Sequence, residues 1–276
     1  MPRVVLRLAY EGTGYCGWQT QSNRQSLQDD LELALSQIAL EKVRVFCAGR
    51  TDASVHALSQ IVHFDTEANR PLTAWVKGVN RCLSELYAQP RHYGLGRMMV
   101  RNAQQTSTAF HARFSATSRT YFYVIYNDVD WHPHWVNRSG FYYRPLDLPA
   151  MQEAAHVLEG CHDFSAFRAA ECQAKSPIRT IQYLKIKTYP PFLLAQIQAD
   201  GFLHHMIRNI LGALLAIGSG DEPVARMRHW LLAGERSLLP PTFAASGLYF
   251  AGAQYPPNIL SFPTLCGHEE ILPGLA

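Results

Sequence analysis

The feature that most limits the fold of this chain is the order in which strand-like and helix-like segments follow one another. Residues 3–10 alternate with the period of two that is typical of a strand. Ser26 and Asp29 resemble a capping box, and an apolar helical stripe runs from Leu27 to Ile38 behind them. The other elements expected in this half are β-prone runs at 43–47 and 61–64, a helix that begins at Pro71, and a strand at 120–126. The first half therefore has the order strand, helix, strand, strand, helix, strand.

The second half partly repeats this order after a connector, 128–135, that is rich in Trp, His and Pro. The expected elements are a helix through Met151, Ala155 and Leu158, strands at 183–189 and 193–199, an apolar helix at 203–217, a helix from Pro223 capped by Asp221, and a strand at 248–251. Two α/β halves of similar makeup predict an α+β fold with mainly antiparallel sheets. A cleft between two such halves is the usual place for an active site.

The length of the chain also favours two domains. A chain of 276 residues, of which 47% are hydrophobic, can bury more than one compact core. The expected divisions are an N-terminal α/β domain at 1–127 that carries the loop 49–56, a connector at 128–148, a C-terminal α/β domain at 149–255, and an irregular tail at 256–276.

The distribution of charge is more informative than the net charge of +3. Between Leu86 and Asn127 the chain has five arginines and no acidic residue, and the same segment carries Phe110, Phe114 and Tyr121. Arginines interleaved with aromatic side chains are typical of a groove for a polyanion such as RNA. A solvated basic face is an equally open interpretation of this segment alone.

Nothing in the sequence points to a metal site, a membrane span or secretion. The six cysteines lie far apart, without a C-x-x-C pair or a histidine at the spacing of zinc ligands. Met1-Pro2-Arg3 leads directly into alternating sequence, and no apolar stretch approaches the length of a membrane span. We therefore expect reduced cysteines, no bound metal and a cytoplasmic protein.

The segment from Gly49 to His56 is the first candidate for chemistry. It contains the guanidinium of Arg50, the carboxylate of Asp52, two hydroxyls and an imidazole between two predicted strands, and loops held by a sheet often carry function. On composition alone, an ordinary polar turn in which Asp52 forms a cap and His56 bonds to the backbone is the simpler interpretation.

The residues at 48–57, AGRTDASVHA, closely resemble the catalytic motif of the tRNA pseudouridine synthase A (TruA) family. Further motifs follow in the order of that family, at 10–12 with 17–19, 110–117, 163–164 with 167–168, 202–209 and 247–249. The resemblance covers about residues 3–255. One departure is Ser54, which stands where the family usually has Gly, a residue that adopts positive φ without steric cost.

This resemblance implies an enzyme that isomerises uridine to pseudouridine in the anticodon stem-loop of tRNA, at positions 38, 39 and 40. It implies an aspartate and base flipping, and neither a cofactor nor a metal. It further implies the pseudouridine synthase fold, in which two ferredoxin/RNP-like halves surround a central catalytic cleft. The expected partners are the anticodon arm of tRNA and a second copy of the chain in a homodimer, with no membrane association.

The resemblance also assigns roles to single residues. Asp52 matches the catalytic aspartate, the nucleophile, and Arg208 matches the arginine that pairs with it and keeps it ionised. Tyr121 matches the tyrosine that stacks on the target uracil, and Leu248 matches an apolar residue that closes the slot for the base. Arg50 matches the residue that assists base flipping. An ordinary place in the core remains an alternative for Tyr121 and Leu248.

A second group of residues matches positions at which the family touches RNA. Contacts of this kind with phosphates position a nucleic acid and do not read its sequence. The group consists of Arg70, Phe110, His111, Ala112, Arg113, Phe114, Arg168, Glu171, Cys172, Gln173, Ala174 and Lys175.

Two other functions compete with the synthase. A non-catalytic RNA-binding module would be expected to lack the joint set of Asp52, Tyr121 and Arg208. A small-molecule enzyme could use Asp52 with His56 as an acid–base pair, but the arginine-rich segment without acids would then be a coincidence.

Overall fold

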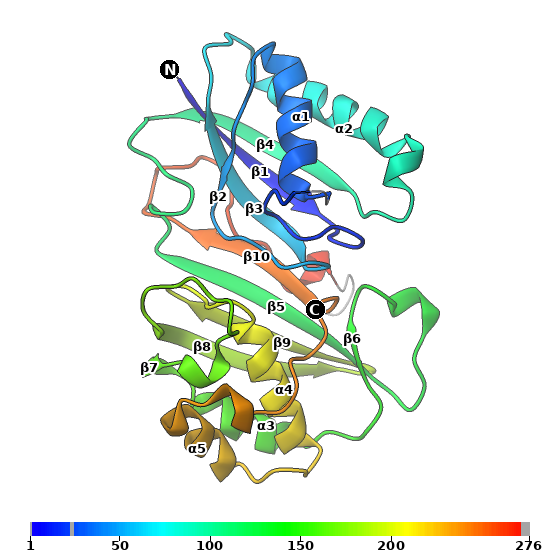
Figure 1. Cartoon of the computed structure of the whole chain (residues 1–276), viewed down its shortest axis with the longest axis vertical. Helices are drawn as coiled ribbons and strands as arrows, with labels where there is room; N and C mark the ends of the chain where they lie inside the picture. Colours follow the sequence, from blue (N-terminus) through cyan, green and yellow to red (C-terminus); the bar gives the residue numbers. More distant parts are fainter. Residues whose placement is uncertain (1, 23–24, 272–276) are drawn as a thin grey trace. The chain divides into compact units, whose positions relative to one another are not determined.

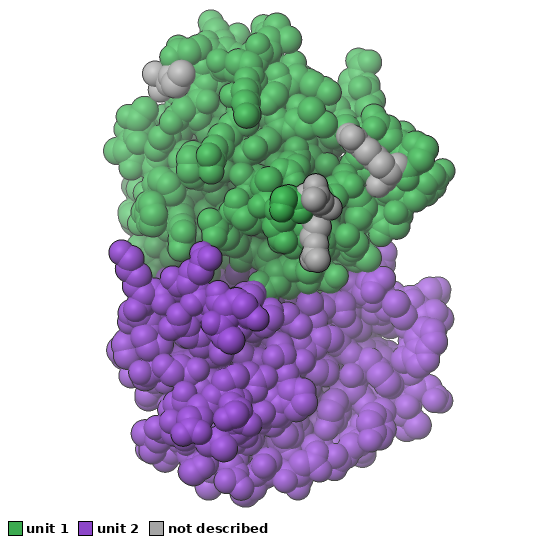
Figure 2. Space-filling view, in the orientation of Figure 1, with its two compact units in different colours: residues 1–119, 249–276 green, residues 120–248 purple. Residues whose placement is uncertain are grey.

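The computed structural model describes residues 2–22 and 25–271, which divide into two compact units. The first unit consists of residues 1–119 and 249–276, and the second of residues 120–248 (Figure 2). The units group the chain differently from the predicted divisions, because 120–127 belong to the second unit and 249–255 to the first. As a statement about domains that fold independently, the predicted boundaries stay a proposal.

The first unit is built on a sheet whose long strands are mostly antiparallel. Its strand order is β4, β1, β3, β10, with the short β2 paired to β3. The strand β1 is antiparallel to both of its neighbours, whereas β3 and β10 run parallel. The bounds are β1 Arg3–Tyr10, β2 Phe46–Cys47, β3 His56–Asp65, β4 Met98–Thr106 and β10 Leu248–Gln254.

Two helices pack against each other in this unit, α1 (Leu27–Ala39) and α2 (Val79–Tyr87) (Figure 1). The predicted capping box is confirmed, since the amide of Asp29 donates to Ser26 Oγ at 3.2 Å. The helix expected from Pro71 is present as a π-helical turn at Ala74–Gly78 that continues into α2.

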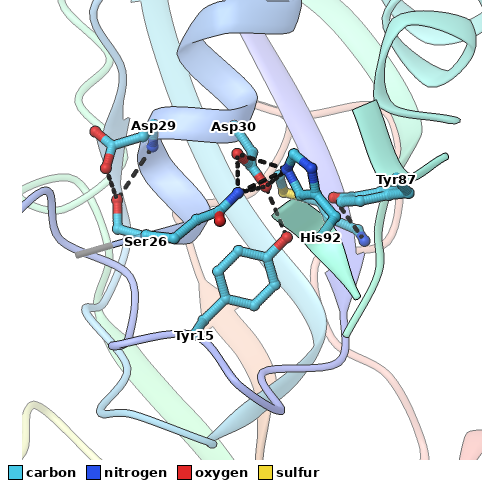
Figure 3. A network of polar contacts seen from close by, with 8 residues as sticks. Tyr15, Ser26, Asp29, Asp30, Tyr87 and His92 are labelled. Carbon is cyan, nitrogen blue, oxygen red and sulfur yellow. Dashed lines mark hydrogen bonds and ion pairs between the residues drawn. The ribbon is translucent and has the colours of Figure 1, made fainter. Parts of the chain in front are cut away.

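A buried polar network fixes the start of α1 (Figure 3). The hydroxyl of Tyr15 donates to Asp30 at 2.7 Å, and His92 Nε2 lies 3.3 Å from the same carboxylate. Gln25 donates to Asp30 at 3.1 Å. Asp30 is 4% exposed, so these donors replace the water that its carboxylate loses on folding.

The second unit has the strand order β5, β9, β8, β7, with β6 parallel to β5. The hairpin of β8 and β9 is antiparallel, as is the pair of β7 and β8. The helix α3 packs against α4 and α5 and against β8. The bounds are β5 Ser118–Asn127, β6 Gly140–Tyr142, α3 Leu148–His156, β7 Gly160–Asp163, β8 Ile178–Tyr189, β9 Phe192–Ala199, α4 Met206–Gly218 and α5 Ala225–Ala233.

The predicted α+β class with mainly antiparallel strand pairing is confirmed, but local details differ. The run 43–47 forms a strand only at Phe46–Cys47, because the amides of Val43 and Val45 donate to Ser36 and Glu32 of α1 instead of a neighbouring strand. The predicted Asp221 cap is wrong. The residue that precedes α5 is Val224, and Asp221 accepts from Arg144 at 2.6 Å.

Three strands were not predicted, namely β4, β6 and β7. Only Met98 and Val100 are buried on β4, while its second half is polar, so it lacks an apolar period. The tail at 256–271 is irregular apart from a single 3-10 turn at His268–Glu270 and a bridge between Gly252 and Leu265. None of the helices in the described part of the chain has the length and apolar character that a membrane span needs.

Candidate active site

The loop that carries Asp52 lies between β2 and β3 and is held on several sides. The amide of Trp18 donates to the carbonyl oxygen of Thr51 at 3.0 Å, and the amide of Val55 donates to that of Asp52 at 3.2 Å. The side chain of Asp52 is half-buried and that of Arg50 is exposed. The loop therefore presents a carboxylate and a guanidinium on a backbone with fixed partners.

Two glycines allow the segment after β1 to approach this loop closely. A Cβ atom on Gly12 would lie 2.1 Å from the carbonyl oxygen of Val55. A Cβ atom on Gly17, which has a φ of +102°, would lie 2.8 Å from that of Thr51. The motifs at 10–12 and 17–19 therefore pack against the motif at 48–57, at points where only glycine leaves enough room.

Ser54 adopts the left-handed conformation that the sequence left open. Its φ is +63°, a region that costs a residue with a Cβ atom about 1 kcal/mol. The loop thus keeps the backbone geometry for which glycine is suited, and Ser54 makes that geometry strained.

His56 contributes to the structure of the loop. It is 2% exposed, its Nδ1 accepts from the amide of Gly12 at 3.1 Å, and its ring stacks on Tyr249 with centroids 4.7 Å apart. A histidine that exchanges protons with a substrate needs access to it. This burial therefore weighs against the alternative in which His56 and Asp52 form an acid–base pair.

The second unit holds the other residues that the resemblance assigned to catalysis. Tyr121 lies on β5, is 7% exposed and meets the ring of Phe202 edge-on with centroids 5.2 Å apart. Leu248 is buried where β10 begins, and the preceding carbonyl of Gly247 accepts from the amide of Val124 on β5 at 2.8 Å. Both side chains are thus fixed by the sheet region of this unit.

Arg208 lies in the first turn of α4 and forms hydrogen bonds with Phe243. Its Nε donates to the carbonyl of Phe243 at 2.8 Å, and the amide of Phe243 donates to the carbonyl of Arg208 at 3.2 Å. The side chain is half-buried, in accordance with its apolar sequence neighbours. The motif 202–209 therefore presents an arginine in a defined direction.

Asn209 is a supporting residue that the sequence analysis did not single out. It is fully buried, donates to the carbonyl of Phe167 at 2.8 Å and accepts from Thr242 at 2.6 Å. These contacts tie α4 to the segment that carries Phe243 and to the motif at 163–168. In the sequence, Asn209 could have been identified only from its place within the motif 202–209.

The segment 110–114 divides into buried and exposed side chains. Phe110 and Ala112 are buried, and the amide of Ala112 donates to His63 at 3.1 Å. Arg113 and Phe114 are exposed, with the guanidinium 5.7 Å from the centre of the Phe114 ring. His111 is half-buried and accepts from the amide of Arg113 at 3.1 Å. The exposed cation and ring are the parts of this segment suited to bind a nucleotide.

The remaining positions assigned to RNA contacts lie on two further segments. Arg70, in the first unit, donates to the carbonyl of Ile38 at 3.1 Å. In the second unit, Arg168 donates to the carbonyl of Cys172, which fixes the loop 171–175. Glu171, Gln173 and Lys175 are exposed there, whereas Cys172 and Ala174 are half-buried.

The thiol of Cys172 has a pKa that differs from that of an ordinary cysteine. Burial raises the pKa of its thiol, but the amides of Ala174 and His204 and the charge of Arg168 outweigh burial, so the pKa of Cys172 lies below its usual value. The amide of His204 donates to its sulfur at 3.4 Å. The thiol thus connects the loop 171–175 to the start of the motif 202–209.

Because His63 is buried, the free energy of unfolding is expected to fall in mildly acidic solution. Burial, followed by the charges of Arg3 and His111, lowers the pKa of His63 to about 4, whereas an unfolded histidine titrates near about 6.5. Between these values the unfolded chain binds a proton that the folded chain does not. As the pH falls from about 6.5 to about 4, we therefore expect this group to lower the free energy of unfolding by up to about 1.4 kcal/mol for each pH unit.

Urea unfolding of the wild type and of His63→Asn at pH 7.5 and pH 5 measures this effect. Asparagine keeps an acceptor for the amide of Ala112 but does not titrate, so its loss of stability between the two pH values should be the smaller one. An equal loss in both proteins would contradict the assignment to His63.

Comparisons with known proteins show the family of this chain. A model of the tRNA pseudouridine synthase family matches residues 154–256. A tRNA pseudouridine synthase A of Bordetella petrii is 48% identical over 260 residues, which are 94% of this chain and 93% of the relative. Those of Methylobacillus flagellatus and Bordetella avium are 47% and 43% identical, over 92% and 99% of this chain and 93% and 98% of their own lengths. This chain therefore belongs to the tRNA pseudouridine synthase A family.

Proposed function

We propose that this chain isomerises uridine to pseudouridine in the anticodon stem-loop of tRNA, at positions 38, 39 and 40. The observation that carries the proposal is the match to relatives named tRNA pseudouridine synthase A over nearly the whole chain. Those relatives are synthases, so the alternative of a non-catalytic RNA-binding module is set aside.

The proposed isomerisation requires a carboxylate that is held in a fixed position. The bond between N1 of uracil and C1′ of ribose breaks, the base turns, and C5 bonds to C1′ while its proton is lost and N1 is protonated. We assign the nucleophile to Asp52, because an ionised carboxylate can hold one half of the substrate while the other turns. The two backbone hydrogen bonds at Thr51 and Asp52 support this role, since a fixed nucleophile needs little reorganisation.

Arg208 and Tyr121 of the second unit complete the proposed catalytic set, and Leu248 of that unit is proposed to bind the substrate. These roles rest on the motif matches. Arg208 is assigned as the cation that pairs with the catalytic carboxylate. Tyr121 stacks on the uracil, and Leu248 closes the slot for the base. The bond between Arg208 and the carbonyl of Phe243 supports a fixed guanidinium.

The RNA is held through the arginines and exposed aromatic groups of the segments named above. Arg70, Arg113 and Arg168 supply cations for phosphates, and the loop 171–175 lies beside Arg168. Phosphate contacts of this kind favour recognition of shape over recognition of sequence. A homodimer and a cytoplasmic location are further parts of the proposal and rest on the resemblance.

One experiment tests the function. The protein is incubated with unmodified tRNA transcripts, and pseudouridine is mapped nucleotide by nucleotide. Conversion at positions 38, 39 and 40 is the expected result. Conversion at other nucleotides would overturn the proposed specificity, and no conversion at all would overturn the proposed activity.

Arg50 is proposed to insert where the uridine leaves the stem. We expect Arg50→Ala to slow conversion on folded tRNA by about tenfold or more, because extruding a base costs a few kcal/mol that the arginine would offset. Single-turnover rates on intact tRNA measure the effect. The matched control is Arg81→Ala, which removes an exposed arginine of α2 and should leave the rate unchanged. Equal rates for Arg50→Ala and wild type would remove the flipping role.

A further inference from the structure

We infer that Tyr10, Thr51 and Gln60 form a positioning network that sets the direction of Arg50 and Asp52, a role that rests on the proposed function. The three side chains come from β1, the loop and β3, and all of them are buried. Because they are buried, we assign them a positioning role and not a catalytic one. The network centres on Gln60, a polar side chain that is fully buried on β3.

Gln60 is fully buried and directs its amide at the loop. Its Nε2 donates to the carbonyl oxygen of Gly49 at 2.7 Å and to the hydroxyl of Tyr10 at 3.3 Å. Its Oε1 has no hydrogen-bond partner among the residues that the structure describes. A buried acceptor without a partner costs stability, so the side chain is poorly explained by stability alone.

Tyr10 connects Gln60 to Thr51, the residue before Asp52. Its hydroxyl lies 2.8 Å from Thr51 Oγ1, and the ring is 4% exposed. Burial raises the pKa of Tyr10 well above its usual value, despite the opposing bonds to Thr51 and Gln60. The hydroxyl therefore keeps its proton and can accept from Gln60 while sharing a hydrogen bond with Thr51.

The anchored residues, Gly49 and Thr51, lie on either side of Arg50, and Thr51 directly precedes Asp52. The carbonyl oxygen of Gly49 precedes Arg50, and Thr51 lies between Arg50 and Asp52. The carbonyl oxygen of Thr51 also accepts from the amide of Trp18 at 3.0 Å. Arg50 is therefore held on both sides, and Asp52 is held at Thr51 and through its own carbonyl, which accepts from the amide of Val55 at 3.2 Å. A displacement of about 1 Å in such a group can cost on the order of a hundredfold in rate.

Tyr10→Phe tests this role because it removes one hydroxyl and no bulk. The expected result is a fall in kcat of about tenfold or more with the KM for tRNA within about twofold, since the substrate surface is intact. Thr51→Val should behave in the same way, and Thr51→Ser should retain activity because it retains the hydroxyl. A merely structural role would not distinguish serine from valine at a temperature where all the variants are folded.

Tyr15→Phe is the matched control. Tyr15 is a buried tyrosine of the same unit, but its hydroxyl donates to Asp30 at the start of α1 and not to the loop (Figure 3). We expect it to lower the free energy of unfolding while leaving kcat within about twofold of wild type.

Hydrogen exchange gives a readout that does not depend on activity. Amides at 49–55 should exchange faster in Tyr10→Phe and in Gln60→Leu than in wild type, and should not do so in Tyr15→Phe. Unchanged exchange in both loop variants, or faster exchange with unchanged kcat, would overturn the inference. An inactive wild type would instead overturn the proposed function, while the exchange experiment would still decide whether the network holds the loop.

Discussion

Asp52→Asn is expected to abolish pseudouridine formation while tRNA binding stays within about twofold of wild type. The substitution replaces one carboxylate oxygen with an amide nitrogen of nearly the same size. The side chain then has no negative charge, and a neutral amide is a poor nucleophile and a poor base. We expect the single-turnover rate to fall by about a thousandfold or more, with the loop geometry unchanged.

The measurement pairs the rate with a binding titration on the same tRNA. Asp65→Asn serves as a matched control, because this carboxylate of the first unit pairs with Arg3 at 2.7 Å and has no role in the proposed site. That variant should keep the wild-type rate. If Asp52→Asn retained more than about a tenth of the wild-type rate, Asp52 would not be the catalytic group.

Gly17→Ala is expected to lower activity strongly although Gly17 lies outside the loop itself. Gly17 has a φ of +102°, and its added Cβ would lie 2.8 Å from the carbonyl oxygen of Thr51 and 3.1 Å from the carbonyl carbon of Asp52. Backbone atoms cannot turn aside as a flexible side chain can. The loop must therefore move, and we expect kcat to fall by about a hundredfold.

The control separates this contact from the strain of the backbone conformation. Gly94 has a φ of +78°, but nothing lies within 4 Å of the Cβ atom that an alanine there would add. Gly94→Ala should lower the free energy of unfolding by about 1 kcal/mol and leave kcat near the wild-type value. A similar loss of activity in both variants would show that strain, and not contact with the loop, explains Gly17→Ala.

The helix α1 illustrates what can be predicted locally. Its start follows from Ser26 and Asp29, whose hydrogen bonds join residues three apart, and its inner face follows from a stripe of apolar residues. Such interactions lie within one or two turns of chain, so they are visible in a short window of sequence. The strands β1, β5, β8 and β9 were found for a similar reason.

The short β2 and the unpredicted β4 illustrate the limit of predicting strands from local sequence. Val43 and Val45 have strand propensity, but their amides bond to side chains of α1. The polar second half of β4 is in the sheet because it pairs with β1, where Leu6 lies opposite Ala103. Propensity describes a residue alone, and strand pairing depends on a partner elsewhere in the chain.

For the candidate site, the sequence by itself determined which residues are proposed to act, because the motif around Asp52 and the matches at Tyr121, Arg208 and Leu248 keep the order of the family. Only the tertiary structure decided how the loop is held. Gly17 and Gln60 act on it through atoms that lie far along the chain from Asp52 or on a different strand. The left-handed backbone of Ser54 was likewise decided there, since the fixed neighbours of the loop impose a φ of +63° that serine does not favour.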